Sequence, residues 1–139
     1  MRGLDTNVLL RYLSADDPVQ SPLAQRLLEE AEDAADESER FYVSAILLCE
    51  LCWRLHAKPF SLDRKGIAAV VERILDTTLF EVQDRDLVRQ ALADYRAGKA
   101  DFPKYLLGRY HRQAGCTDTV SFDPRLDEAE GFLLLRPSK

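Results

Sequence analysis

Short apolar runs alternate along the chain with longer segments of helical periodicity, and this alternation constrains the fold more than any other feature. The predicted strands end at Asp5 or lie at 41–43, 79–82, 118–122 and 132–135. Ser44 and Ser61 are the predicted caps of the two helices that follow the strand at 41–43. Strands that alternate with helices of about 10–15 residues are typical of an α/β fold with parallel strands and right-handed crossovers. We therefore predict one domain over residues 1–139, a three-layer sandwich around a central parallel sheet of four to five strands.

The composition excludes several classes of protein. Hydrophobic residues make up 46% and charged residues 31% of the 139 residues, which argues against global disorder. The longest purely apolar runs have five residues, too few for a transmembrane helix. The N-terminus carries Asp5 within its first apolar stretch and has no small-residue cleavage site, so we do not expect a signal peptide there. We expect a cytoplasmic protein without membrane contact.

The charge is unevenly spread around a net value of −5. Residues 29–40 hold seven acids and one arginine, which we interpret as a solvated helix end and loop. Residues 95–112 carry five Lys or Arg side chains against Asp101 alone. This basic stretch is either another solvated face or a patch for phosphate groups, with Arg109 and Arg112 as the candidate contacts.

The chain has three cysteines, and Cys49 and Cys52 form a C-x-x-C pair. This pair falls inside a predicted helix and lacks the Gly or Pro turn of a redox or zinc motif. We interpret both residues as small core side chains in a reducing compartment.

Three acids stand out by position. Asp5 and Asp123 follow predicted strands, and the carboxyl ends of parallel strands are where sites form in such sheets. Glu50 lies in a helix that is apolar nearly all round, which predicts a buried carboxylate needing a partner or a metal. Helix capping is the alternative for Asp5, and an ordinary Asp-Pro turn is the alternative for Asp123.

Together these acids predict a cluster of oxygen ligands without histidine or thiolate. Such ligands suit the hard cations Mg²⁺ or Mn²⁺. A divalent ion held by carboxylates can activate water and neutralise phosphoryl charge, which points to phosphodiester hydrolysis.

Four stretches of the chain resemble PIN-domain nucleases, and specifically the VapC toxins of toxin–antitoxin pairs. They occur in the family's order and spacing, at 4–13, 43–51, 100–102 and 114–123. The resemblance implies a sheet ordered 3-2-1-4-5 and a Mg²⁺-dependent endoribonuclease with an RNA substrate. It implies that Asp5, Glu50 and Asp123 are catalytic and metal-binding acids, and that Asn7 and Ser121 are polar supports.

One position departs from the family pattern. The family usually has a further acid three residues after the aspartate that starts the helix before the fourth strand, and this chain has Lys104 there. An inward-pointing Lys104 would pair with Asp5 or Asp123 and compete with Mg²⁺, whereas an outward one would keep its ammonium in water. Asp101 is the candidate replacement for the missing catalytic acid. The sequence therefore predicts a weakened or inactive ribonuclease.

The resemblance also implies partners. These are a cognate VapB-type antitoxin and a second copy of the chain, with apolar helix faces at 18–31 and 44–57 forming a groove for the antitoxin's tail. The alternative function is a catalytically dead PIN domain that binds antitoxin or RNA. An aspartyl-phosphate phosphatase is a weaker alternative, because such enzymes need a second acid two residues after the first and this chain has Asn7.

Overall fold

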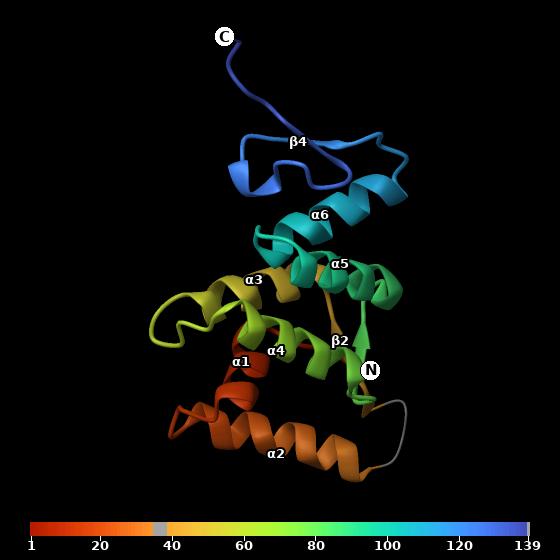
Figure 1. The fold of residues 1–139 in the computed structure, drawn as a ribbon. Coiled ribbons are helices and arrows are strands. Elements are labelled where there is room, and N and C mark those ends of the chain that lie inside the picture. Colours follow the sequence, from red (N-terminus) through yellow and green to blue (C-terminus); the bar gives the residue numbers. More distant parts are fainter. Residues whose placement is uncertain (35–38, 139) are drawn as a thin grey trace.

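The strands form two separate parallel sheets. A computed structural model describes residues 1–34 and 39–138 (Figure 1). Strands β1 (Arg2–Gly3), β2 (Phe41–Val43) and β3 (Phe80–Val82) form one sheet in that order, and β4 (Thr119–Ser121) pairs with β5 (Phe132–Leu134) in the other. The predicted α/β class is confirmed. The single sheet of four to five strands is not present, because no strand in the described chain bridges β1 and β4.

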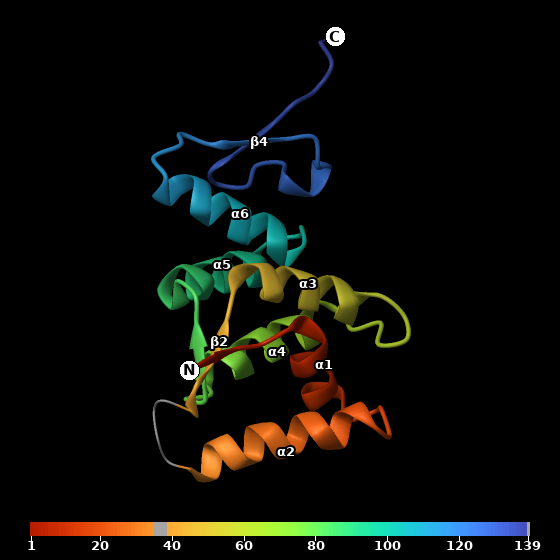
Figure 2. The same cartoon turned by 180° about the vertical axis from the view of Figure 1, so that it is seen from behind.

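Six α-helices in the described residues connect and cover these strands. They are α1 (Thr6–Ser14), α2 (Gln20–Asp33), α3 (Ala45–His56), α4 (Arg64–Asp76), α5 (Arg85–Ala97) and α6 (Phe102–Gln113), with a short 3₁₀ helix, η2 (Pro124–Leu126), before β5. Helix α6 packs on α5 and on α3. Figures 1 and 2 show α6 lying between the first sheet and β4. None of the described helices is long and apolar enough to span a bilayer.

The apolar side chains that the sequence places at helical spacing form one core. Its largest fully buried members are phenylalanines from β2, β3 and α6 with leucines and isoleucine from the helices: Phe41, Phe80, Phe102, Leu9, Leu28, Leu48, Ile74, Leu75 and Leu106. Cys52 belongs to this core and Cys49 packs against it, as predicted for small core residues. Burial raises the pKa of both thiols, so they stay protonated at neutral pH.

Two helix starts show how local sequence sets the boundaries. Ser44 caps α3 as predicted, its hydroxyl accepting the N–H of Leu47 at 3.1 Å. For α4 the predicted cap, Ser61, is wrong. Asp63 holds that position and its carboxylate accepts the N–H of Gly66 at 2.8 Å. Ser61 instead has a left-handed backbone with φ 48°.

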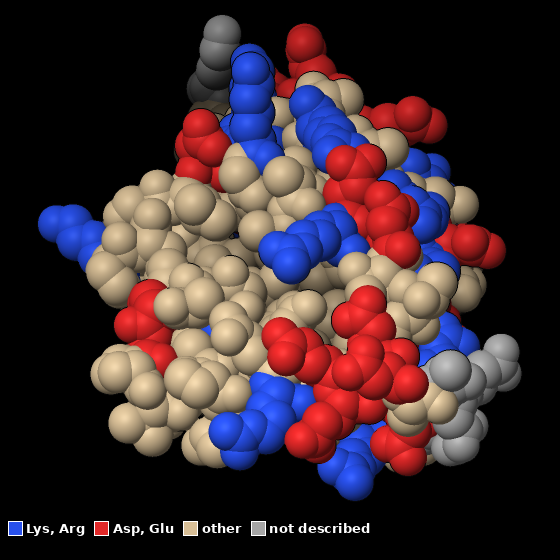
Figure 3. All heavy atoms as spheres, turned by 90° about the horizontal axis from the view of Figure 1, so that it is seen from below, with Lys and Arg blue, Asp and Glu red and all other residues tan. Residues whose placement is uncertain are grey.

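The acidic run lies at the C-terminal end of α2. The four acids from Glu29 to Asp33 are exposed, as expected for a solvated helix end. Figure 3 shows acidic side chains gathered on this face of the molecule. The other part of the predicted acidic loop, 35–38, lies outside the described residues.

One arginine joins α4 to the turn between α5 and α6. The guanidinium of Arg64 donates hydrogen bonds to the carbonyl oxygens of Tyr95, Gly98, Lys99 and Ala100 at 2.5–3.1 Å. It also lies 4.1 Å from the centre of the Tyr95 ring. Carbonyls at a helix end have no partner within the helix, so this side chain satisfies groups that the turn would otherwise leave unpaired. Arg64 thereby fixes where α6 begins.

We predict that Arg64→Met lowers the free energy of unfolding by about 2–4 kcal/mol, because several charged hydrogen bonds are lost at once. The neighbouring exposed Lys65 is the matched control, and Lys65→Met should change stability by less than about 0.5 kcal/mol. Urea unfolding of the two variants measures both values. Equal stabilities would contradict the role given to Arg64.

Candidate functional site

The first half of the candidate site lies where β1 leads into α1 and faces α3. Asp5 is the N-cap of α1, and its carboxylate accepts the N–H of Thr6 at 2.8 Å. The buried Thr6 hydroxyl lies 3.3 Å from Oε2 of Glu50 and donates to it. Thr6 therefore contacts both acids and brings Asp5 and Glu50 to the same corner of the fold. The capping interpretation of Asp5 is correct, and the cap leaves its side chain exposed.

The prediction that Glu50 is buried is wrong. Glu50 is exposed, as are Ile46 (71%) and Trp53 (57%) on the same helix. Helix α3 is apolar nearly all round in sequence, but only one side of it, with Leu48 and Leu51, enters the core. The carboxylate of Glu50 therefore carries no burial penalty and is open to solvent.

Asn7 borders this corner but points to another partner. Its side-chain oxygen accepts a hydrogen bond of 2.8 Å from Arg54 of α3. Arg54 thus adds a second link between α1 and α3, four residues beyond Glu50.

The second half of the candidate site lies at the end of β4. The guanidinium of Arg125 binds Asp123 with its nearest contact at 2.8 Å, and the same group binds Asp101 at 3.1 Å. The hydrogen bonds from Arg125 hold the pKa of Asp123 below its ordinary value, and the charge of Lys104 adds to the effect. Asp123 therefore remains ionised well into the acidic range. The hydroxyl of Ser121, the other predicted support, accepts the N–H of Asp123 at 3.0 Å.

Lys104 lies on α6 near Asp123 without forming an ion pair. Its charge acts on Asp123, yet no carboxylate of a described residue lies within 4 Å of its ammonium. Among the residues that the structure describes, Lys104 therefore does not form the predicted salt bridge to Asp5, Glu50 or Asp123. Arg125 takes the place of that cation, because its planar guanidinium can bind two carboxylates at once.

The two halves do not combine into a metal site in this arrangement. No group of three or more acidic, histidine or cysteine side chains in residues 1–34 and 39–138 is placed to hold a metal ion. Asp123 and Asp101 share Arg125, whereas Asp5 and Glu50 are linked through Thr6. The carboxylates have the right chemistry for a hard divalent cation, although no three of those in the described residues meet in this arrangement.

The two basic candidates differ in their surroundings. Arg109 binds Asp94 through two hydrogen bonds, at 2.6 and 2.8 Å, which hold its guanidinium on α5. Arg112 is exposed, near the end of α6. Of the two, Arg112 has the freer guanidinium for a phosphate group.

Sequence reasoning missed Arg125, Arg54 and Thr6. Arg125 follows Asp123 by two residues, and that spacing was the available signal, since the turn after a strand lets a side chain reach back to the acid. Thr6 follows Asp5 directly and is one of the few buried polar residues. No sequence signal links Arg54 to Asn7, which lie 47 positions apart.

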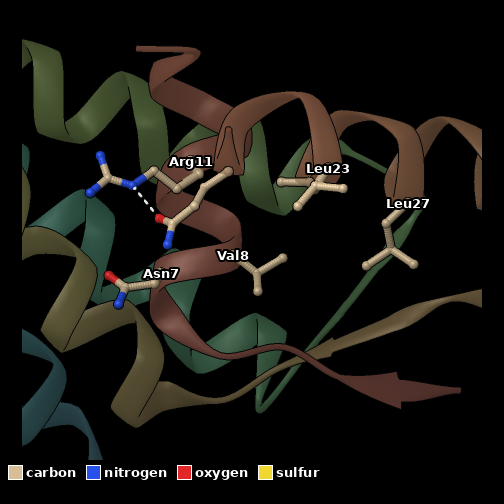
Figure 4. A pocket seen from close by; sticks show the side chains of 7 residues that line it. Asn7, Val8, Arg11, Leu23 and Leu27 are labelled. Carbon is tan, nitrogen blue, oxygen red and sulfur yellow. Dashed lines mark hydrogen bonds between the residues drawn. The ribbon is translucent and has the colours of Figure 1, made fainter. Parts of the chain in front are cut away.

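Apolar surface flanks the first half of the site. A pocket of about 260 Å³ lies between α1 and α2. Figure 4 labels five of the residues that line it, Asn7, Val8, Arg11, Leu23 and Leu27. Arg11 donates to Gln20 across its rim at 3.1 Å. The exposed apolar residues of α3 face α6 instead, so the helices predicted to form one groove each have a different neighbour.

The chain is similar to a known ribonuclease and matches one protein family. The VapC ribonuclease of Aquifex aeolicus (strain VF5) is 28% identical over 137 residues, which cover 99% of this chain and 97% of that relative. No solved structure matches the chain. Residues 4–131 match the PIN domain family, and this range includes every candidate acid described above. The chain therefore belongs to the PIN domain family.

Proposed function

We propose that the chain is an endoribonuclease and the toxin of a VapBC-type toxin–antitoxin pair, with low activity because Lys104 replaces an acid. The observation that carries the proposal is the family match over 4–131, with Asp5 and Glu50 exposed at one corner and joined through Thr6. The similarity to a ribonuclease over 99% of the chain supports RNA as the substrate.

The proposed catalytic acids are Asp5, Glu50, Asp123 and Asp101. PIN-domain nucleases generally use divalent metal ions, which supply charge neutralisation at the phosphate. We propose Mg²⁺ or Mn²⁺ here, because the candidate ligands are all carboxylates. Asn7, Ser121 and the phosphate contacts Arg109 and Arg112 complete the proposed set.

The proposed partner is a VapB-type antitoxin. The pocket between α1 and α2 begins at Asn7, two residues from Asp5, so an apolar peptide seated there would lie beside the acids. We also propose a homodimer and a cytoplasmic location.

A catalytically dead PIN domain that binds antitoxin or RNA is the second candidate. Lys104 and the lack of a group of three candidate ligands among the described residues favour it, because each weakens a cation site. Binding of RNA without cleavage in the presence of Mn²⁺ would support this alternative.

We predict that Lys104→Asp raises RNA cleavage in Mg²⁺ or Mn²⁺ by at least about tenfold. The substitution changes the charge beside Asp123 by two units, and ~1.4 kcal/mol already corresponds to a factor of ten. Cleavage of a labelled RNA with and without a chelator measures the rate. Lys99→Asp, at an exposed lysine before α6, makes the same charge change and should leave the rate low. Fast, chelator-sensitive cleavage by the unmodified chain would refute the prediction.

We predict that Glu50→Gln weakens Mn²⁺ binding by at least about tenfold, because one anionic ligand is lost. Since Glu50 is exposed, unfolding free energy should change by less than about 0.5 kcal/mol. Calorimetric titration with Mn²⁺ and urea unfolding give the two values. Glu29→Gln, at an exposed acid of α2, is the matched control. Unchanged Mn²⁺ affinity in Glu50→Gln would remove Glu50 from the ligand set.

A further inference from the structure

An apolar groove runs between α3 and α6, on the side of α3 that does not enter the core. Its volume is about 460 Å³, within the range of about 300–1,000 Å³ that ligand sites occupy. Large apolar side chains on its walls are in contact with water: Ile46 is 71% exposed, Trp53 57% and Leu107 45%. Apolar surface gathered around a hollow is typical of a binding site rather than of an ordinary solvated face.

The groove also carries a cation that has no counterion. Among the described residues that line it, Asp101 is paired with Arg125, whereas no carboxylate lies within 4 Å of the ammonium of Lys104. The hydroxyl of Tyr110 donates to Asp84 at 2.9 Å, so the ring of Tyr110 is the part left to line the groove. The groove therefore combines aromatic and apolar walls with one available positive charge.

An unpaired nucleotide matches this combination. A nucleobase stacks on an exposed aromatic ring such as Trp53, and its phosphate binds a cationic side chain such as Lys104. An apolar peptide would match the walls but would remove water from the Lys104 ammonium without giving it a partner, which costs free energy. Charge complementarity therefore favours a nucleotide over an apolar peptide as the occupant.

The groove lies beside the candidate acids. Ile46, Glu50 and Trp53 follow one another at spacings of four and three residues, so they share one stripe of α3. Trp53 lies about 4.5 Å beyond Glu50 along the helix axis. Asp101, from the other half of the candidate site, lines the groove from α6. A base in the groove would therefore have its sugar and phosphate next to acids of both halves.

We propose that this groove is a subsite for one unpaired base of the RNA substrate, which stacks on Trp53 while an adjoining phosphate binds Lys104. The inference rests on the proposed function for the identity of the substrate, and it names the part of the RNA that the chain holds. Stacking accepts any base and favours the larger rings of purines. A duplex binds less well, because its bases are already stacked on each other.

Trp53 is the single tryptophan of the chain, so its fluorescence reports on this groove alone. In EDTA, where no divalent ion supports cleavage, a short single-stranded oligoadenylate should quench the emission. An abasic oligomer with the same number of phosphates should bind at least about tenfold more weakly, because stacking is lost. Equal affinities for the two oligomers overturn the proposal. Emission that oligoadenylate leaves unchanged also overturns it, and is expected if an apolar peptide is the occupant.

The same fluorescence tests whether the groove is open in the free protein. Acrylamide should quench the emission, because the indole of Trp53 is exposed. Emission that acrylamide does not reach would show that a second copy covers Trp53, and this result overturns the proposal.

Substitutions of Trp53 test the stacking. Trp53→Ala should weaken binding of a labelled oligoadenylate at least about tenfold, measured by fluorescence anisotropy in EDTA. Trp53→Phe keeps an aromatic face and should lose about threefold or less. Leu133→Ala, at an exposed apolar residue of β5 outside the groove, is the matched control and should bind as the parent does. A Trp53→Ala variant with the affinity of the parent overturns the proposal.

Substitution of Lys104 tests the phosphate contact. Lys104→Met should weaken binding and reduce the slope of log affinity against log salt concentration by about one, as expected for one lost phosphate contact. Lys65→Met, at an exposed lysine of α4 outside the groove, should change neither value. An unchanged salt slope in Lys104→Met overturns the assigned phosphate contact.

Binding in EDTA is independent of cleavage, so the two proposals can fail separately. Oligoadenylate that binds as expected but is never cut in Mn²⁺ would count against the proposed function and not against the subsite. Cleavage with the same KM in the parent and in Trp53→Ala would count against the subsite alone.

Discussion

The bonds from the Arg64 guanidinium to four carbonyls between α5 and α6 set the geometry on which the candidate site depends. They fix the start of α6 against α4 and α5, and the hydroxyl of Tyr105 completes the turn by accepting the N–H groups of Lys99 and Ala100. Because α6 is held there, Asp101 and Lys104 at its first turn are held as well. The path of the chain after α6 then places β4 on the far side of this helix from β2.

Local features of the fold could be predicted from the sequence, and the junction between the sheets could not. The strands at 41–43 and 132–134 and the cap at Ser44 follow from short-range patterns of apolar residues and side-chain oxygens. Pairing of β1 with β4 depends on contacts between residues more than a hundred positions apart. Strands this short carry little register information of their own, so the pattern alone cannot place them in one sheet.

The candidate site, too, could be predicted only in part from the sequence. Asp5 and Asp123 are candidates because each follows a predicted strand. Their surroundings could not be predicted, because Thr6 and Arg125 act through side-chain geometry. For Glu50 the prediction of burial is wrong, because a helix that is apolar nearly all round is not covered on every side. Apolar content records how much surface a helix could bury, whereas the neighbouring elements decide how much it does bury. The exposed Ile46 and Trp53 show that difference.

The arginine that binds Asp123 has a consequence for any cation that arrives there. Because Arg125 already pairs with both Asp123 and Asp101, a divalent ion that bound these two carboxylates would compete with its guanidinium. The cation would then exchange with the guanidinium, and the free energy needed to break the Arg125 ion pairs would weaken cation binding. The displaced Arg125 would then be a free cation beside the acids, with the planar geometry that suits a phosphate group. Loading a cation would thus convert an internal counterion into an anion-binding group.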